Sequence, residues 1–265
     1  MSISARIEQA LQHADTLRID THAALLQGRA CLDLTTLEST DTAAIVRTLA
    51  QRARDAQVAA LCIFPTHYRE AAAVLQDSSV RTATVAMAFP HGQAPLASRL
   101  LEVELAVQQG FDEIDVVIPR HLVLDGLWQT LADELQQTRA VCGERALKVI
   151  LETGELQRSD LIYRSAMLAL EAGADFVKTS TGKTAIGATP EAAAALSLAV
   201  KDHGESKGVK ISGGVRSVDD FLRYYRIARA ISGETALRPA QWRVGASSLL
   251  NALDAALTSS EAERL

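Results

Sequence analysis

The sequence predicts an α/β protein built as a single (β/α)8 TIM barrel with an extra N-terminal helix. Its 265 residues suit one such barrel, because this fold often reaches roughly 200 to 250 residues as one domain. Eight short runs of β-branched or apolar residues recur at intervals of about 30 residues, the length that a strand, a helix and two loops require. The segments between the runs show helical spacing. One closed barrel accommodates this repeat.

The eight apolar runs are the predicted strands. They start near Cys31, Val58, Val80, Glu113, Leu147, Ala174, Val209 and Trp242. Several are almost continuously apolar, such as LKVILE at residues 147–152 and EIDVVI at residues 113–118. Parallel strands that are covered on both faces typically have this composition.

Capping signals mark the predicted helices between the strands. Thr189 precedes Pro190 and Glu191, which places a cap, a first-turn proline and an early carboxylate ahead of an Ala-rich segment. Ser217 with Asp220 marks the start of another helix.

We expect one domain over residues 1–265. Residues 1–28 form an extra N-terminal helical segment, in which residues 3–17 have helical spacing and are expected to pack against the barrel. Residues 29–258 form the barrel, and residues 259–265 form a short C-terminal tail.

Charge and cysteine content restrict the class of partner. The net charge of −5 argues against a broad basic surface for nucleic acid or an anionic membrane. Cys31, Cys62 and Cys142 are too few and too scattered for a disulfide framework. No apolar run approaches the roughly 18 residues of a membrane span. We therefore expect a cytoplasmic protein with small-molecule partners, and leave open a homo-oligomer, either dimer or tetramer.

Active sites of such barrels lie at the C-terminal ends of the strands, so polar residues there are candidates. They are Asp33, Thr35, Cys62, Asp115, Glu152, Thr153, Lys178 and Lys210. Each has a structural alternative. A strand-end Asp or Thr can cap a loop, Cys62 can be a small core residue, and Glu152 can pair with a lysine of a neighbouring strand.

Two lysines in apolar sequence point to amine chemistry. Lys178 lies in FVKTSTGK and Lys210 in VKISGGVR, on strands predicted to be neighbours. Two like charges about 4 Å apart repel by about 4 kcal/mol at an effective dielectric near 20, equivalent to about three pKa units for one amine. A free amine beside an ammonium forms Schiff bases with carbonyl compounds, and Asp115 is the candidate acid or base. The residues leave open which lysine attacks, and either lysine alone could simply extend its head to solvent.

Glycine-rich segments follow the last three predicted strands: TSTGK, SGGVR and VGASS, the last running into a helical pattern. Backbone N–H groups in such loops, together with a helix N-terminus, bind phosphate without global positive charge. Loops after the seventh and eighth strands commonly do so in these barrels.

The ordered motifs resemble those of the deoxyribose-phosphate aldolases, class I aldolases and lyases on a (β/α)8 barrel. The resemblance runs from about Cys31 to Leu250 through CLDLTTL, ALCIFP, DEIDVVIP, VILETGEL, FVKTSTGK, VKISGGVR and VGASSLL. It implies that Lys178 is the Schiff-base lysine, that Lys210 lowers its pKa, and that Asp115 relays protons.

The resemblance also implies the substrate contacts. The phosphate is expected at Thr181, Gly182, Lys183, Gly213, Gly214, Gly245, Ser247 and Ser248. Asp33 and Thr35 are expected near the sugar hydroxyls, and Cys62 near the acceptor pocket. Several bacterial relatives end in a tyrosine that assists proton transfer, whereas this sequence ends TSSEAERL. Water held by Asp115 and Lys210 is the expected substitute.

The implied reaction is reversible cleavage of 2-deoxy-D-ribose 5-phosphate into D-glyceraldehyde 3-phosphate and acetaldehyde. An iminium is itself the electron sink, so no metal ion or organic cofactor is expected. Two alternatives stay open: another Schiff-base aldolase on the same barrel, and a non-catalytic barrel that binds phosphosugars.

Overall fold

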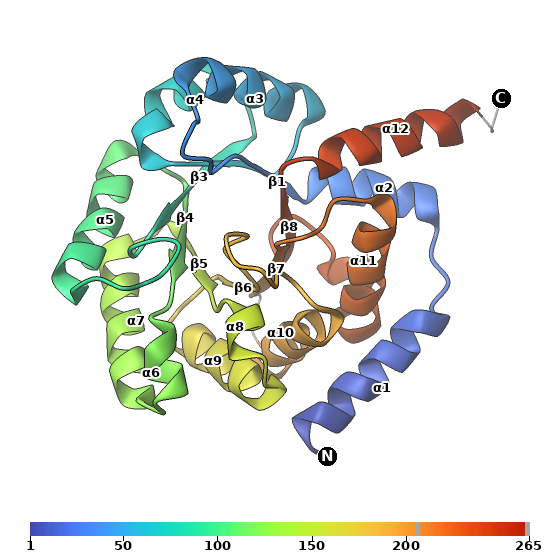
Figure 1. The fold of residues 1–265 in the computed structure, drawn as a ribbon. Helices are drawn as coiled ribbons and strands as arrows, with labels where there is room; N and C mark the ends of the chain where they lie inside the picture. The colour runs from blue at the N-terminus through green and yellow to red at the C-terminus, as the bar shows by residue number, and fades with distance from the viewer. Residues whose placement is uncertain (205–206, 263–265) are drawn as a thin grey trace.

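The computed structural model describes residues 1–204 and 207–262, and within them eight parallel strands close a barrel in the order β1 to β8 (Figure 1). The strands are β1 (Leu32–Thr35), β2 (Ala60–Ile63), β3 (Arg81–Ala86), β4 (Glu113–Val117), β5 (Ala146–Ile150), β6 (Phe176–Lys178), β7 (Gly208–Ser212) and β8 (Trp242–Ala246). Each begins within two residues of its predicted start. The predicted fold class is confirmed.

Helices surround the strands as a ring (Figure 1). The helices that follow the strands are α3 (Ala43–Ala56), α4 (Tyr68–Leu75), α5 (Leu96–Gln109), α7 (Trp128–Cys142), α9 (Ser159–Glu171), α10 (Pro190–His203), α11 (Val218–Ser232) and α12 (Leu249–Ala262). Shorter elements are α6 (Arg120–Leu124), α8 (Thr153–Leu156), η1 (Pro65–His67) and η2 (Glu234–Ala236).

The predicted extra helix is confirmed as α1 (Ile3–Thr16), and a second helix, α2 (Thr21–Ala30), leads into β1. Helix α1 lies outside the ring against α10 and α11 (Figure 1). The Arg6 guanidinium binds the Asp202 carboxylate of α10 at 2.7 Å, which ties the extra helix to the barrel. At the other end, α12 continues to Ala262, so residues 259–262 are helical, and residues 263–265 of the predicted tail lie outside the described residues.

Both predicted helix starts are confirmed. The Thr189 hydroxyl accepts a hydrogen bond from the Ala192 N–H at 3.1 Å at the start of α10. Ser217 and Asp220 form a reciprocal capping box at the start of α11. These caps satisfy N–H groups that the first helical turn leaves without intrahelical partners.

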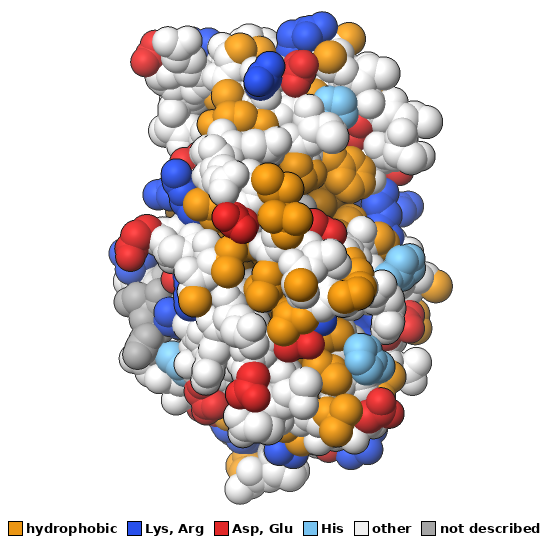
Figure 2. All heavy atoms as spheres, turned by 90° about the vertical axis from the view of Figure 1, so that its left-hand side faces the viewer, with side chains coloured by type: hydrophobic (Ala, Val, Ile, Leu, Met, Phe, Trp, Pro, Cys, Tyr) orange, Lys and Arg blue, Asp and Glu red, His pale blue; other side chains and the backbone are white. Residues whose placement is uncertain are grey.

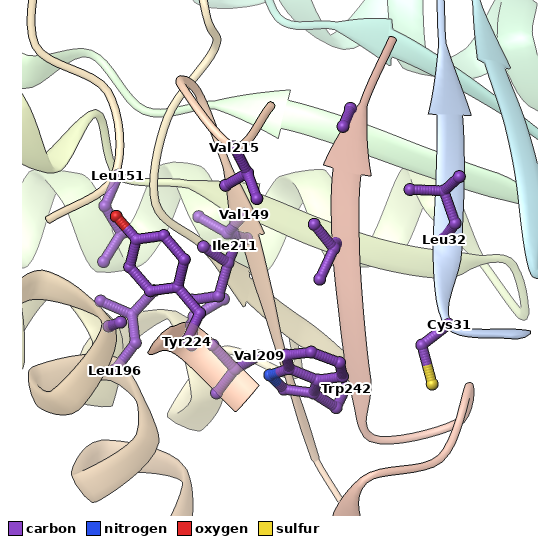
Figure 3. Close-up of a cluster of buried hydrophobic side chains, with 14 of the residues drawn as sticks. Cys31, Leu32, Val149, Leu151, Leu196, Val209, Ile211, Val215, Tyr224 and Trp242 are labelled. Atoms are coloured by element: carbon purple, nitrogen blue, oxygen red, sulfur yellow. The ribbon is translucent and has the colours of Figure 1, made fainter. Parts of the chain in front are cut away.

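The hydrophobic core lies between the barrel and its helices. Figure 3 shows Val209 and Ile211 of β7 and Trp242 of β8 beside Leu196 of α10 and Tyr224 of α11. Side chains alternate across a strand, so the residues between these apolar ones point into the barrel. The barrel interior is where the charged residues gather.

One side of the surface is rich in apolar side chains. Figure 2 shows hydrophobic atoms gathered on the side that carries α5 and α6, where Leu101, Leu105 and Leu124 are exposed. In the described part of the chain, no helix has both the length and the apolar character needed to cross a membrane.

Candidate active site

Strand register brings the predicted catalytic residues together inside the barrel. Lys178 of β6 and Lys210 of β7 are register partners, and Asp115 of β4 is paired with Lys148 of β5. All four side chains are buried. The expectation that both predicted lysines face inward at the same height is therefore confirmed.

The Asp115 carboxylate is the centre of this group. Its Oδ2 accepts hydrogen bonds from the Nζ atoms of Lys178 and Lys210, each at 2.7 Å. Its Oδ1 accepts a hydrogen bond from the Lys148 Nζ at 2.6 Å. Three ammonium or amine groups therefore share one carboxylate, and the predicted pair of lysines is in fact a set of three.

Two further carboxylates distinguish the three lysines. Lys148 Nζ also lies 2.7 Å from Glu113 and 3.5 Å from Asp33. Lys210 Nζ lies 2.6 Å from Asp33. Among the described residues, the shared Asp115 is the only carboxylate that forms an ion pair with Lys178. The lysine with the fewest carboxylate partners holds its proton least strongly.

The pKa directions follow this order. Burial lowers the pKa of Lys178, and the charge of Lys210 adds to that effect, while Asp115 opposes it. Burial also disfavours the charged form of Lys210, but Asp115 and Asp33 outweigh it and raise the pKa of that lysine. The same balance holds the pKa of Lys148 well above its usual value. Of the three lysines, Lys178 is the one whose pKa is lowered, a distinction that the residues alone left open.

The predicted cause of the shift needs a correction. The predicted cause was repulsion between the like charges of Lys178 and Lys210. Burial is instead the largest cause, and the attraction of the Asp115 carboxylate, which raises the pKa of Lys178, is a larger effect than the repulsion from Lys210. Asp115 itself stays ionised, because Lys148, Lys178 and Lys210 outweigh its burial and hold its pKa well below the usual range.

Sequence reasoning missed Lys148, Glu113 and Arg243, although all three are buried inside the barrel. Lys148 and Glu113 lie in runs that were read as apolar strands, and Arg243 lies directly after the core residue Trp242. Each is a charged residue at an inward position of a strand. That alternation was the signal that could have identified them.

The mouth of the barrel holds a cavity of about 200 Å³ beside Lys178. Its lining includes most of the predicted phosphate-binding residues: Thr181, Gly182, Lys183, Gly213, Gly214, Gly245 and Ser247, together with Thr35. Gly213 and Gly214 have φ values of 91° and 88°, a conformation that side chains rarely adopt. The loops after β6, β7 and β8 therefore converge on one space above the amine.

Three predicted binding residues lie outside that lining. Asp33 is buried and binds Lys210 and Arg243. Cys62 is fully buried in a cluster with Leu37, and burial raises the pKa of its thiol, which fits the core alternative. Ser248 is exposed but does not line the cavity.

Glu152 fixes the loop after β6. Its buried carboxylate accepts hydrogen bonds from the Thr181 hydroxyl at 2.5 Å and from the Thr184 hydroxyl at 3.2 Å. The Arg120 guanidinium lies 3.7 Å from the same carboxylate and donates to the Pro90 carbonyl at 3.1 Å. The predicted alternative of a Glu152–lysine pair is wrong, because the partner cation is an arginine.

The backbone of Glu152 is itself unusual. Its φ of 54° and ψ of 61° lie in the left-handed region, which is uncommon for a non-glycine residue. Backbone of this kind persists where surrounding contacts fix it, and it clusters at functional sites. Here it directs the carboxylate toward the loop that carries Thr181 and Lys183.

The sequence of this chain matches a known protein family. Residues 30–255 match the model of the DeoC/LacD family aldolases. The chain belongs to this family. Deoxyribose-phosphate aldolase of Homo sapiens is 37% identical over 276 aligned residues, covering 96% of this chain and 86% of the human protein.

Two further relatives agree with this assignment. The Bos taurus deoxyribose-phosphate aldolase is 39% identical and covers 85% of this chain and 78% of its own length. Among solved structures, the tetrameric deoxyribose phosphate aldolase of Aeropyrum pernix superposes with a TM-score of 0.71 at 25% identity, covering 96% of this chain and 98% of its own. The family resemblance seen in the motifs is therefore confirmed.

Proposed function

We propose that this aldolase is of class I and reversibly cleaves 2-deoxy-D-ribose 5-phosphate into D-glyceraldehyde 3-phosphate and acetaldehyde. One observation carries the proposal. Lys178 lies at the base of the mouth cavity with Asp115 as its carboxylate partner, while burial lowers its pKa. A buried amine of lowered pKa beside an ammonium is the group that attacks a carbonyl carbon.

The first steps form the electron sink. The Lys178 amine adds to C1 of the open-chain sugar, and the carbinolamine loses water to give an iminium. Lys210 stays protonated because Asp33 and Asp115 raise its pKa. It supplies the proton that turns the departing hydroxyl into water, and hydrogen bonds to Asp115 hold it in place.

Bond cleavage then uses that sink. A water polarised by the Asp115 carboxylate takes the proton of the C3 hydroxyl, the C2–C3 bond breaks, and its electron pair moves into the iminium. D-Glyceraldehyde 3-phosphate leaves, and an enamine remains on Lys178. Protonation at C2 by the same water and hydrolysis of the new iminium release acetaldehyde and the free amine. Because the iminium accepts the electron pair, these steps require no metal ion or organic cofactor.

The mouth loops support binding of the remote phosphate. Lys183 and the glycine-rich backbone after β6, β7 and β8 line the cavity that opens above the amine. Backbone N–H groups of this kind bind phosphate oxygens locally, which suits a protein whose net charge is −5. Holding the phosphate places C1 against the amine, so binding energy is used for orientation.

We also propose a cytoplasmic homo-oligomer, a dimer or a tetramer. The three cysteines are free and buried, which suits a reducing compartment. The Aeropyrum pernix relative is described as tetrameric, and the apolar face over α5 and α6 offers area for a subunit contact. Light scattering on the purified protein measures its molar mass in solution and so gives the number of subunits.

A substrate panel tests the proposed reaction. Purified protein is mixed with 2-deoxy-D-ribose 5-phosphate, and both products are measured with coupled dehydrogenases. The reverse direction is tested with D-glyceraldehyde 3-phosphate and either acetaldehyde or dihydroxyacetone. Preference for the ketone donor would indicate another Schiff-base aldolase. Binding of the phosphosugar without any turnover would indicate a non-catalytic barrel.

A further inference from the structure

Below the mouth cavity, the barrel interior holds an unequal number of opposite charges. The cluster has the carboxylates of Asp33, Glu113 and Asp115 and the cationic groups of Lys148, Lys178, Lys210 and Arg243. With every group ionised, the cations outnumber the carboxylates by one. All of them are buried, so solvent screens the excess only weakly. Loss of one proton from one lysine brings the cluster to neutrality.

Arg243 and Glu113 form the lower part of this cluster. The Arg243 guanidinium donates hydrogen bonds to Asp33 at 2.5 Å and to Glu113 at 2.9 Å. Glu113 also contacts Lys148 at 2.7 Å. Neither Arg243 nor Glu113 lines the mouth cavity. Their charges therefore act on the lysines without touching a bound sugar.

We propose that Arg243 and Glu113 are positioning residues whose paired charges set the proton count of the cluster and so make Lys178 the lysine that is free at neutral pH. This rests on the proposed function, because it assigns the origin of the attacking amine. Arg243 keeps its charge across the whole pH range of enzymes. With Arg243 present, the cluster has one more cation than carboxylates. Without the Glu113 carboxylate, the excess would be two.

The contacts decide which lysine loses the proton. Lys148 keeps its proton between three carboxylates, and Lys210 keeps its proton between two. Lys178 has the shared Asp115 alone among the described residues. The lysine that loses its proton is therefore Lys178, whose amine also faces the substrate cavity.

Asp115 of β4, Lys210 of β7 and Cys62 of β2 act directly on Lys178. The rest of the cluster reaches it through Asp115 and Lys210: Asp33 of β1, Glu113 of β4, Lys148 of β5 and Arg243 of β8. On the cavity side, Glu38, Lys183 and Arg216 line the same space as Lys178. On β3, Arg81 lies 3.8 Å from Glu113, but its side chain is 58% exposed and its charge is screened by solvent. Cys62 stays a neutral thiol, since burial raises its pKa.

Four variants test the proposal: Glu113→Gln, Arg243→Met, Arg243→Lys and the double variant Glu113→Gln/Arg243→Met. The rate of reductive trapping with acetaldehyde and cyanoborohydride is measured against pH, which reports the fraction of free amine apart from turnover. The acid limb is the pH range over which the trapping rate rises as the amine loses its proton. Arg243→Met removes the excess cation and so favours the protonated amine. The acid limb should therefore move up by about one pH unit. Glu113→Gln increases the excess, so the limb should move down by a similar amount.

The double variant and the lysine replacement make the test specific. Removing both charges restores an excess of one cation, so the limb of the double variant should return to the wild-type position. Arg243→Lys keeps the charge and should also leave the limb in place. A loss of packing would not shift two single variants in opposite directions and then cancel. If Arg243→Met fails to fold, Glu113→Gln and the double variant carry the same test.

The outcomes separate this proposal from the proposed function. Opposite shifts that cancel in the double variant support it. Unshifted limbs, or two shifts of the same sign, in variants that still trap acetaldehyde would overturn it and leave the aldolase proposal intact. A wild-type protein that traps no acetaldehyde at any pH would overturn the proposed function itself.

Discussion

Replacing Lys210 with methionine is the sharpest perturbation of the amine that we assign as nucleophile. Methionine keeps much of the side-chain volume and removes the positive charge. Asp115 and Asp33 both lose a cationic partner. The carboxylate charge that remains then stabilises the protonated form of Lys178 more strongly. The pKa of Lys178 should rise, and the free amine should appear only at higher pH.

The contacts give the size of this shift. The Nζ atoms of Lys178 and Lys210 each lie 2.7 Å from the same Asp115 oxygen, so their charges are roughly 4 Å apart. At an effective dielectric near 20 this corresponds to about 4 kcal/mol, or about three pKa units. Water that enters the mouth cavity reduces the effect, and we expect a shift of about two units.

The assay is reductive trapping of acetaldehyde as a function of pH, with adduct counted by intact mass. Trapping requires only the free amine, so a further role of Lys210 in proton transfer does not obscure the result. The control is Lys201→Met on α10, which removes an exposed lysine outside the cluster and should leave the profile unchanged. An acid limb that stays in place in Lys210→Met would refute the electrostatic account of the site.

Three other substitutions give independent results. Lys178→Ala should abolish turnover and trapping while leaving the circular dichroism spectrum and Tm near wild type, because Asp115 keeps two cationic partners. Glu152→Gln weakens the charge-assisted hydrogen bond that holds Thr181 in the loop after β6, so KM for 2-deoxyribose 5-phosphate should rise about tenfold. An equal rise in KM for unphosphorylated deoxyribose would count against a role of this loop in phosphate binding. Gly245→Ala places a Cβ 3.0 Å from Lys210 Cε and 3.1 Å from Ser212 Cβ. The Lys210 amine should be displaced, which should lower kcat about tenfold and the free energy of unfolding by about 1–2 kcal/mol; wild-type kinetics would contradict this expectation.

The fold was predictable because its signals are local. Buried strands such as EIDVVI carry their apolar composition in consecutive residues, and helix caps such as Thr189 lie within one turn of the N–H groups that they bind. The inward register of Lys178 and Lys210 followed from their places in adjacent strands. These features need no knowledge of distant contacts.

The charge network was not predictable in the same way. Glu113 and Arg243 are 130 residues apart in sequence, and their pairing depends on how the eight strands close around one interior. The ion pairs of Asp33 with Lys210 and Arg243 likewise depend on strands that are distant in sequence. Lys148 lies within the apolar run LKVILE, so its side chain was not recognised as a third amine beside Asp115. Without it, the relative pKa values of the three lysines could not be predicted.

The central claim is that Lys178 is the one lysine of the cluster that attacks a carbonyl group. The most direct test is peptide mass spectrometry of the active protein after borohydride reduction in the presence of acetaldehyde. The account predicts one ethyl group per chain, on the peptide segment FVKTSTGK at Lys178. An ethyl group on Lys148 or Lys210, or full activity in a preparation that forms no adduct, would contradict it.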